Sequence, residues 1–177
     1  MKRVFSVAIL ITGLVYGLQA NAQDDKADKS KRPSPPAKVT QKIHSGATIS
    51  IDYSQPSVKG RTIGKDLEPM DGKVWRTGAN EATVFETDKN IVVGGKTLAA
   101  GKYGLFTIFN GNEVTVIFNK TWKQWGAFKY SDADDALRID TKSEDVKNVA
   151  EKMTFKIDEK GTVTLLWGNK KVKFEVK

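Results

Sequence analysis

The sequence predicts an all-β protein: an antiparallel β-sandwich or jelly-roll-like barrel of about eight to ten short strands, with little helix. Two observations predict this fold class. Apolar and polar residues alternate in segment after segment, which is the period of a half-buried strand. Glycine-containing turn pairs separate these segments, as in strands joined by tight turns. Together the two patterns favour stacked antiparallel layers over packed helices.

The alternation recurs in five segments. In residues 48–54, Ile49, Ile51 and Tyr53 share one face, and Ser50 and Asp52 share the other. The same pattern is found in residues 113–119, 153–157, 163–167 and 172–176. Residues 103–109 are apolar on both faces over much of their length, which is typical of a central strand covered on both sides.

Four glycine-containing pairs are predicted turns. Asn110-Gly111 lies between two apolar strands and predicts a type I′ hairpin, because that turn needs positive φ at both central residues. The other pairs are Gly94-Gly95, Lys160-Gly161 and Gly168-Asn169. One short helix is predicted over residues 143–152, with Ser143 as N-cap and two acidic residues in its first turn.

The first 22 residues are predicted to be a cleavable export signal. Lys2 and Arg3 precede an apolar stretch of about 15 residues, and Ala20-Asn21-Ala22 supplies the small residues of a cleavage site. The stretch is shorter than the roughly 20 residues that cross a bilayer. We therefore expect cleavage after Ala22, no stable membrane insertion, and a periplasmic or extracellular location.

The remainder divides into two parts. Residues 23–37 are charged and rich in proline without apolar periodicity, and predict a disordered leader. Residues 38–177 predict a single domain, long enough to bury about 70% of the surface that its unfolded chain exposes. The chain has no cysteine, which excludes disulfides, a thiol nucleophile and a Cys-ligated metal.

Charge argues against nucleic acid as a partner. Removing Lys2 and Arg3 takes the 29 basic residues to 27 against 21 acidic ones, so the net charge falls from +8 to +6. The lysines are spread along the chain, whereas nucleic-acid binding favours clustered bases, often arginines with aromatic residues. Weak attraction to acidic polysaccharides or lipid headgroups is compatible with this charge.

Most kinds of catalytic site are excluded by the residues present. His44 is the only histidine, so a multi-histidine metal site is excluded, and there is no G-x-S-x-G motif and no glycine-rich phosphate loop. No metal and no cofactor are therefore expected. Asp132, Asp134 and Asp135 lack the spacing of a calcium-binding loop and are predicted to lie in a solvated loop.

Two stretches carry the candidate site. In residues 74–85, a turn at Gly78 would bring Arg76 near Glu81, either as a structural ion pair with Asn80 bonded to backbone, or as polar groups that line a pocket. Residues 121–130 hold four aromatic residues that could form a stacking platform or cover the open end of the sandwich: Trp122, Trp125, Phe128 and Tyr130.

Five blocks of sequence closely resemble the bacterial domain-of-unknown-function family 2911: residues 32–43, 49–63, 72–87, 98–108 and 116–128. The W-R-T-G-A-N-E run in residues 75–81 is the most specific. The resemblance implies an exported β-rich protein and no particular activity, substrate or cofactor. Some members carry C-terminal helical repeats, which this chain is expected to lack. The polar positions of the family pattern are Asp52, Tyr53, Lys59, Gly60, Arg61, Arg76, Asn80 and Glu81.

Three functions remain open from the sequence. The first is a binding module for a small polar or carbohydrate ligand, held by Arg76, Asn80, Glu81, Trp125, Asp52 and Arg61. The second is a structural or interaction protein of the cell envelope, in which these residues only stabilise the loop. The third is a metal-free hydrolase or lyase that uses Glu81 with Arg76 or Tyr53.

Overall fold

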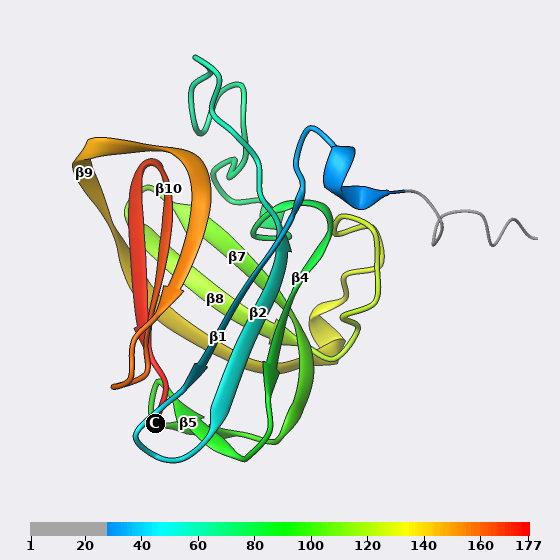
Figure 1. The fold of residues 1–177 in the computed structure, drawn as a ribbon, viewed down its shortest axis with the longest axis vertical. Coiled ribbons are helices and arrows are strands. Elements are labelled where there is room, and N and C mark those ends of the chain that lie inside the picture. Colours follow the sequence, from blue (N-terminus) through cyan, green and yellow to red (C-terminus); the bar gives the residue numbers. More distant parts are fainter. Residues whose placement is uncertain (1–27) are drawn as a thin grey trace, which may run out of the picture.

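A computed structural model describes residues 28–177; the predicted export signal and residues 23–27 of the predicted leader lie outside the described residues. The described part is all-β, as predicted (Figure 1). Its strands are β1 (Pro36–Lys42), β2 (Thr48–Ser54), β3 (Val74–Trp75), β4 (Ala79–Thr87), β5 (Ile91–Val93), β6 (Lys96–Leu98), β7 (Gly101–Asn110), β8 (Glu113–Asn119), β9 (Asp135–Ile157) and β10 (Thr162–Glu175). Two 3-10 turns, η2 (Lys29–Lys31) and η3 (Asp132–Asp134), accompany them.

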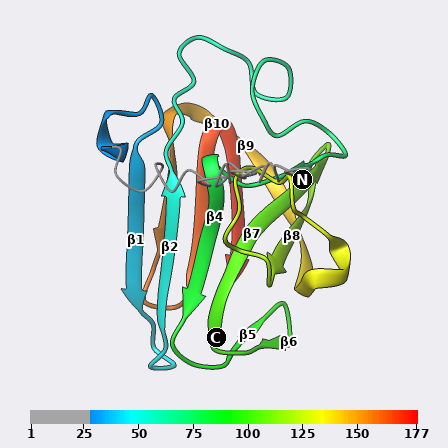
Figure 2. The ribbon, with the colours of Figure 1, turned by 90° about the vertical axis from the view of Figure 1, so that its right-hand side faces the viewer.

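Eight of these strands form one antiparallel sheet. Its order is β1-β2-β4-β7-β8-β9-β10, with β3 beside β7, while β5 and β6 form a separate hairpin. Figure 2 shows β1, β2, β4, β7 and β8 side by side, with β9 and β10 behind them. The sheet therefore curls back on itself as a half-barrel, in agreement with the predicted sandwich or barrel.

Backbone contacts hold the two ends of the curled sheet together. The amide of Met153 in β9 donates to the carbonyl of Pro56 at 3.0 Å, and the amide of Val58 donates to the carbonyl of Glu151 at 2.8 Å. The core lies between the facing layers, where the Phe118 ring packs edge-on against Phe85 at 5.0 Å and against Phe174 at 6.0 Å. All three rings are buried, and burial of large aromatic groups of this kind dominates the stability of a core.

The helix predicted over residues 143–152 is wrong, because these residues lie within β9. The first part of β9 pairs with β8, and the rest pairs with β10. Glu144 and Asp145 lie opposite Lys171 and Lys170 and form ion pairs with them, instead of occupying the first turn of a helix. Pairing with a strand that follows in the sequence outweighs the local preference, which is a common outcome for weak propensities.

The predicted turns have mixed outcomes. Gly94 and Gly95 join β5 to β6, and both have positive φ, as a type I′ turn requires. The β7–β8 turn is one residue later than predicted, because Asn110 pairs with Glu113. Its central residues are therefore Gly111 and Asn112, of which only Gly111 has positive φ, the pattern of a type II′ turn.

Gly168-Asn169 is not a turn. Gly168 lies inside β10 at a register shift with φ of +55°, so it forms a β-bulge. A Cβ at this position would lie 2.6 Å from Cγ1 of Ile63, closer than atoms can pack. Glycine is favoured wherever the backbone needs a positive φ, and both turns and β-bulges can need one. The sequence alone therefore does not distinguish a bulge from a turn at Gly168.

The structure describes the segment before β1 from Asp28 onward. Residues 29–31 form η2, and β1 begins at Pro36, which pairs with Ser54 of β2. Residues 28–37 belong to the predicted disordered leader; in the structure Lys29 and Arg32 contact Glu81, and the carbonyl of Ser34 accepts from Asn80 at the beginning of β4, as described below. The composition of the segment does not predict these contacts, because they join polar groups that are distant in sequence.

Candidate functional site

The candidate site forms where the first residues of β4 pair with the loop between β8 and β9, residues 120–134, which we call the tryptophan loop. The amide of Ala82 donates to the carbonyl of Gln124 at 3.0 Å, and the amide of Gly126 donates to the carbonyl of Asn80 at 2.9 Å. These bonds place Glu81 and Trp125 opposite each other in an antiparallel bridge. Two stretches that the sequence treats separately thus meet at one place.

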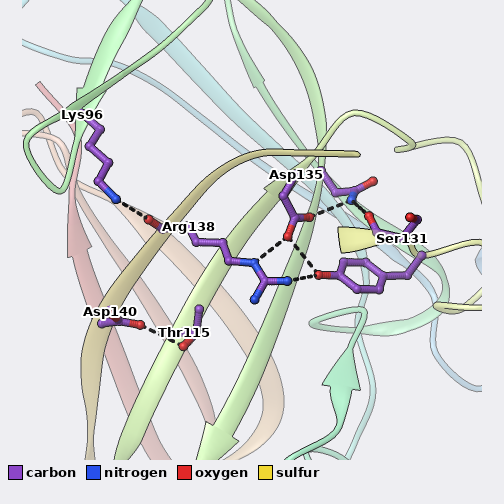
Figure 3. A network of polar contacts seen from close by, with 8 residues as sticks. Lys96, Thr115, Ser131, Asp135, Arg138 and Asp140 are labelled. Atoms are coloured by element: carbon purple, nitrogen blue, oxygen red, sulfur yellow. Dashed lines mark hydrogen bonds and ion pairs between the residues drawn. The ribbon is translucent and has the colours of Figure 1, made fainter. Parts of the chain in front are cut away.

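A partly buried polar network fixes the ends of the tryptophan loop to the sheet (Figure 3). Nδ2 of Asn119 donates to the carbonyl of Ser131 at 2.9 Å and to Oδ1 of Asp135 at 2.8 Å. The other oxygen of Asp135, Oδ2, accepts from Nε of Arg138 at 2.6 Å and from the hydroxyl of Tyr130 at 3.0 Å. Since the Asp135 side chain is only 8% exposed, the prediction of a solvated loop is wrong at this residue.

Tyr130 belongs to this network and not to an open platform. Its ring packs edge-on against Phe106 at 5.1 Å, and its hydroxyl also accepts from Nη2 of Arg138 at 2.7 Å. Burial, followed by the hydrogen bond to the Asp135 carboxylate, raises the pKa of Tyr130 to about 12. A negative charge on the phenol is unfavourable here because it would face that carboxylate.

Glu81 is held by two cations from the segment before β1. Nη1 of Arg32 donates to both carboxylate oxygens at 2.9 Å, and Nζ of Lys29 lies 3.1 Å from Oε1. Burial alone would raise the pKa of Glu81, but the hydrogen bonds from Arg32 and Lys29 outweigh it, so the pKa is lowered. Glu81 is therefore a carboxylate at neutral pH, and its side chain is 38% exposed.

Arg32 links Glu81 to the aromatic part of the site. Its guanidinium carbon lies 5.8 Å from the centre of the Trp125 ring, within the range of a cation–π interaction. Figure 1 shows the segment before β1 close to the tryptophan loop, beside β4. The sequence alone did not predict that Arg32 and Lys29 belong to the site, because both lie in the predicted leader. The one indication for Arg32 was its place at the start of the first block that resembles the family.

Two adjoining hollows flank Glu81, and together we call them the Glu81 groove. One has a volume of about 430 Å³ and the other of about 200 Å³. Both are lined by Lys29, Glu81, Ala82 and Val84. The larger one continues along the tryptophan loop, where its walls are Trp122, Lys123, Gln124, Trp125 and Lys129. The smaller one continues along the β1–β2 pair, where its walls include Asp52 and Tyr53.

The four aromatic residues of the tryptophan loop have different environments. Trp125 is 49% exposed and lines the Glu81 groove, as does the half-buried Trp122, over whose ring Nζ of Lys102 lies at 5.6 Å. Phe128 is 86% exposed and does not line the groove. Since Tyr130 belongs to the polar network at the base of the loop, the two tryptophans are the residues placed to stack against a ligand.

The predicted pair of Arg76 and Glu81 does not form. Arg76 lines a separate hollow of about 190 Å³ together with Arg61, and no residue lines both this hollow and the Glu81 groove. Asn80 has φ of +57°, and its Nδ2 donates to the carbonyl of Ser34 at 3.0 Å. Asn80 therefore bonds to backbone, which is the structural alternative stated above.

Asp52 and Tyr53 have structural partners as well. Oδ2 of Asp52 accepts from Nζ of Lys38 at 2.9 Å across the β1–β2 pair. The Tyr53 ring packs edge-on against Phe155 at 5.1 Å, and its hydroxyl accepts from the amide of Phe155 at 3.3 Å. The hydroxyl of Tyr53 thus points across the core to β9.

Residues 28–177 contain neither a metal-binding cluster nor a membrane-spanning helix. This part of the chain has no group of three or more His, Cys, Asp or Glu side chains placed to hold a metal ion. Nor does any helix within it have the length and apolar character needed to span a bilayer.

Comparison with known proteins gives one match. The model of a family described as "Protein of unknown function (DUF2911)" matches residues 34–176. The matched range contains Glu81, both tryptophans of the groove and Arg76, and it begins after Lys29 and Arg32. No curated protein and no solved structure matches the chain.

The environment of Tyr130 gives a testable prediction. We expect one tyrosine to titrate near 12, and Tyr130→Phe to remove that transition from a spectrophotometric pH titration. Asp135→Asn should move it toward 10, because the adjacent negative charge is lost. Since the folded-state pKa lies above the unfolded value of about 10, the contribution of Tyr130 to stability is complete below pH ~10 and is lost as the pH rises toward ~12. A transition that is unchanged in Asp135→Asn would contradict this network.

Proposed function

The chain belongs to the DUF2911 family, and we propose that it binds a small polar or carbohydrate ligand in the Glu81 groove. One observation carries the proposal: a half-exposed tryptophan, Trp125, lies directly beside an ionised carboxylate in a hollow of about 430 Å³. Pockets of about 300–1,000 Å³ with apolar walls and a few fixed polar groups are typical small-molecule sites.

The walls of the groove suit a ring with hydroxyl groups. Trp122 and Trp125 offer flat apolar surface, and Glu81 accepts hydrogen bonds at a position fixed by the backbone bridge to Trp125. Lys29, Lys123 and Lys129 line the same hollow, against the single carboxylate of Glu81. The excess positive charge favours neutral or acidic ligands over basic ones.

Binding is favoured over catalysis by the electrostatics of Glu81. A general acid at neutral pH needs a raised pKa, whereas that of Glu81 is lowered. Its two cationic partners also make the carboxylate a poor general base. Of the proposed helpers, Arg76 lines the other hollow, and the hydroxyl of Tyr53 accepts a bond in the core. The hydrolase or lyase alternative therefore lacks support.

Export is part of the proposal. Two sequence features support cleavage after Ala22 and release outside the cytoplasm. They are the apolar stretch that follows Lys2 and Arg3, and the small residues of Ala20-Asn21-Ala22. Expression of the whole chain in a bacterium, followed by mass spectrometry of the exported fraction, should give a protein that begins at Gln23. Recovery of only the full-length chain in the cytoplasm would contradict this.

Ligand binding is tested by titrating the purified protein with a panel of neutral and acidic oligosaccharides and cell-wall fragments, followed by tryptophan fluorescence and melting temperature. A ligand present at about 100 times its Kd should stabilise the fold by roughly 2.7 kcal/mol. Trp125→Ala should weaken binding about tenfold or more, equal to roughly 1.4 kcal/mol, and should leave stability nearly unchanged because the ring is half-exposed.

Phe128→Ala is the matched control, since it removes an exposed aromatic residue of the same loop that does not line the groove. It should leave binding unchanged. If no member of the panel binds, or if both variants lose the same affinity, the proposal fails. The Glu81 contacts are then structural, as expected for the envelope-protein alternative.

A further inference from the structure

We propose that the second hollow, around Arg76, is a separate binding site for a small organic carboxylate. The hollow has a volume of about 190 Å³ and lies between the β2–β3 connection and the turn that leads into β4. It contains two of the candidate residues that the Glu81 groove does not use, Arg61 and Arg76. Its ligand is therefore distinct from the one proposed above, and either site can exist without the other.

The guanidinium of Arg76 includes a buried N–H group that has no hydrogen-bond acceptor in the described part of the chain. Arg76 is half-buried, and its Nε is inaccessible to solvent without a hydrogen-bond partner in residues 28–177. No carboxylate of these residues lies within the 4.0 Å of an ion pair with it. A buried polar group without a partner is costly. Nη1 and Nη2 of Arg76 likewise have no hydrogen bond or ion pair within residues 28–177, and they are the groups that a ligand in the hollow would meet.

Glu68 acts on the charge of Arg76 through space, while its carboxylate accepts a hydrogen bond elsewhere. Oε2 of Glu68 accepts from the amide of Met70 at 2.8 Å, which fixes the side chain within its own turn. Burial lowers the pKa of Arg76, and the negative charge of Glu68 acts in the opposite direction through space. The carboxylate stabilises the cation without occupying its hydrogen-bonding fork.

Arg61 supplies a second cation at the same hollow. Its Nε donates to the carbonyl of Val58 at 3.1 Å, and its Nη2 donates to the carbonyl of Ser57 at 2.8 Å. These two bonds hold the exposed guanidinium in place and leave Nη1 available. With Arg61 and Arg76 against Glu68, the hollow carries one excess positive charge.

The remaining walls indicate an organic ligand. Trp75, Trp167, Leu67 and Pro56 line the hollow, and both indole N–H groups are already used: Nε1 of Trp75 donates to the carbonyl of Gly78, and that of Trp167 to the carbonyl of Glu68. Apolar walls favour a carbon body over a fully hydrated inorganic ion. A guanidinium fork matches a carboxylate in a bidentate manner.

The turn that presents Arg76 is strained in the way that binding loops often are. Thr77 follows Arg76 with φ of +50°, a left-handed conformation that is rare for a β-branched residue. The strain is held in place by neighbours: Oγ1 of Thr83 donates to the carbonyl of Thr77 at 2.8 Å, and Thr77 and Thr107 share a bond between their hydroxyls at 3.1 Å. Such conformations cluster at functional sites.

The test compares benzoate with benzamide, a neutral molecule of nearly the same shape, by calorimetric titration of the purified protein at constant ionic strength. Benzoate should bind, and benzamide should bind at least about tenfold more weakly, as expected for loss of charged hydrogen bonds. Arg76→Met and Arg61→Gln should each weaken benzoate about tenfold. Equal affinity for the two probes, or no binding of benzoate, overturns the proposal.

Two variants separate a binding role from a purely structural one. Glu68→Gln should tighten benzoate binding, because it removes the negative charge that opposes the ligand; unchanged or weaker binding in a folded variant overturns the proposal. Lys65→Gln is the matched control for net charge, since it removes an exposed cation from the same connection without lining the hollow. Neither Lys65→Gln nor Trp125→Ala should change benzoate affinity. The test of this hollow is therefore independent of whether the Glu81 groove binds a ligand. If Arg76→Met does not fold, Arg61→Gln and Glu68→Gln decide the outcome.

Discussion

The backbone pairing between the first residues of β4 and the tryptophan loop is the interaction on which the candidate site depends. Two bonds, from Ala82 to Gln124 and from Gly126 to Asn80, extend the sheet by a short irregular strand. Without them, Glu81 would project from the end of β4 into solvent, and Trp125 would lie on an independent loop. The chemistry of the groove therefore follows from main-chain geometry, which side chains then complete.

Two polar clusters hold this pairing in place from opposite sides. On the sheet side, Asn119 and Asp135 use their side-chain groups to close the base of the loop. On the outer side, Arg32 binds Glu81 and lies over Trp125, and Lys29 of the same segment lines the groove. Fully satisfied buried polar groups of the first kind specify one arrangement of the chain. The outer contacts are more exposed and are consequently weaker.

The fold class could be predicted from the sequence, and so could the stretches that supply Glu81 and Trp125 to the candidate site; the reasons are local. Alternation along a strand directly reports which face is buried, and Glu81 and Trp125 lie in unusual polar and aromatic stretches. What could not be predicted depends on pairing between distant segments. Arg32 lies in a stretch whose composition indicates disorder, although it binds Glu81. The local pattern of residues 143–152 favours a helix, whereas their pairing with β10 makes them a strand. Arg76 directly precedes Thr77, whose positive φ has no sequence signature, and Arg76 lines a different hollow from Glu81.

Hydrogen–deuterium exchange of the Ala82 and Gly126 amides tests the central claim most directly, because both amides exist in a protected form only if β4 pairs with the tryptophan loop. The account predicts slow exchange of both amides, comparable with amides in the β7–β8 pair and much slower than that of the exposed Lys123 amide in the same loop. Exchange of Ala82 and Gly126 as fast as that of Lys123 would contradict it.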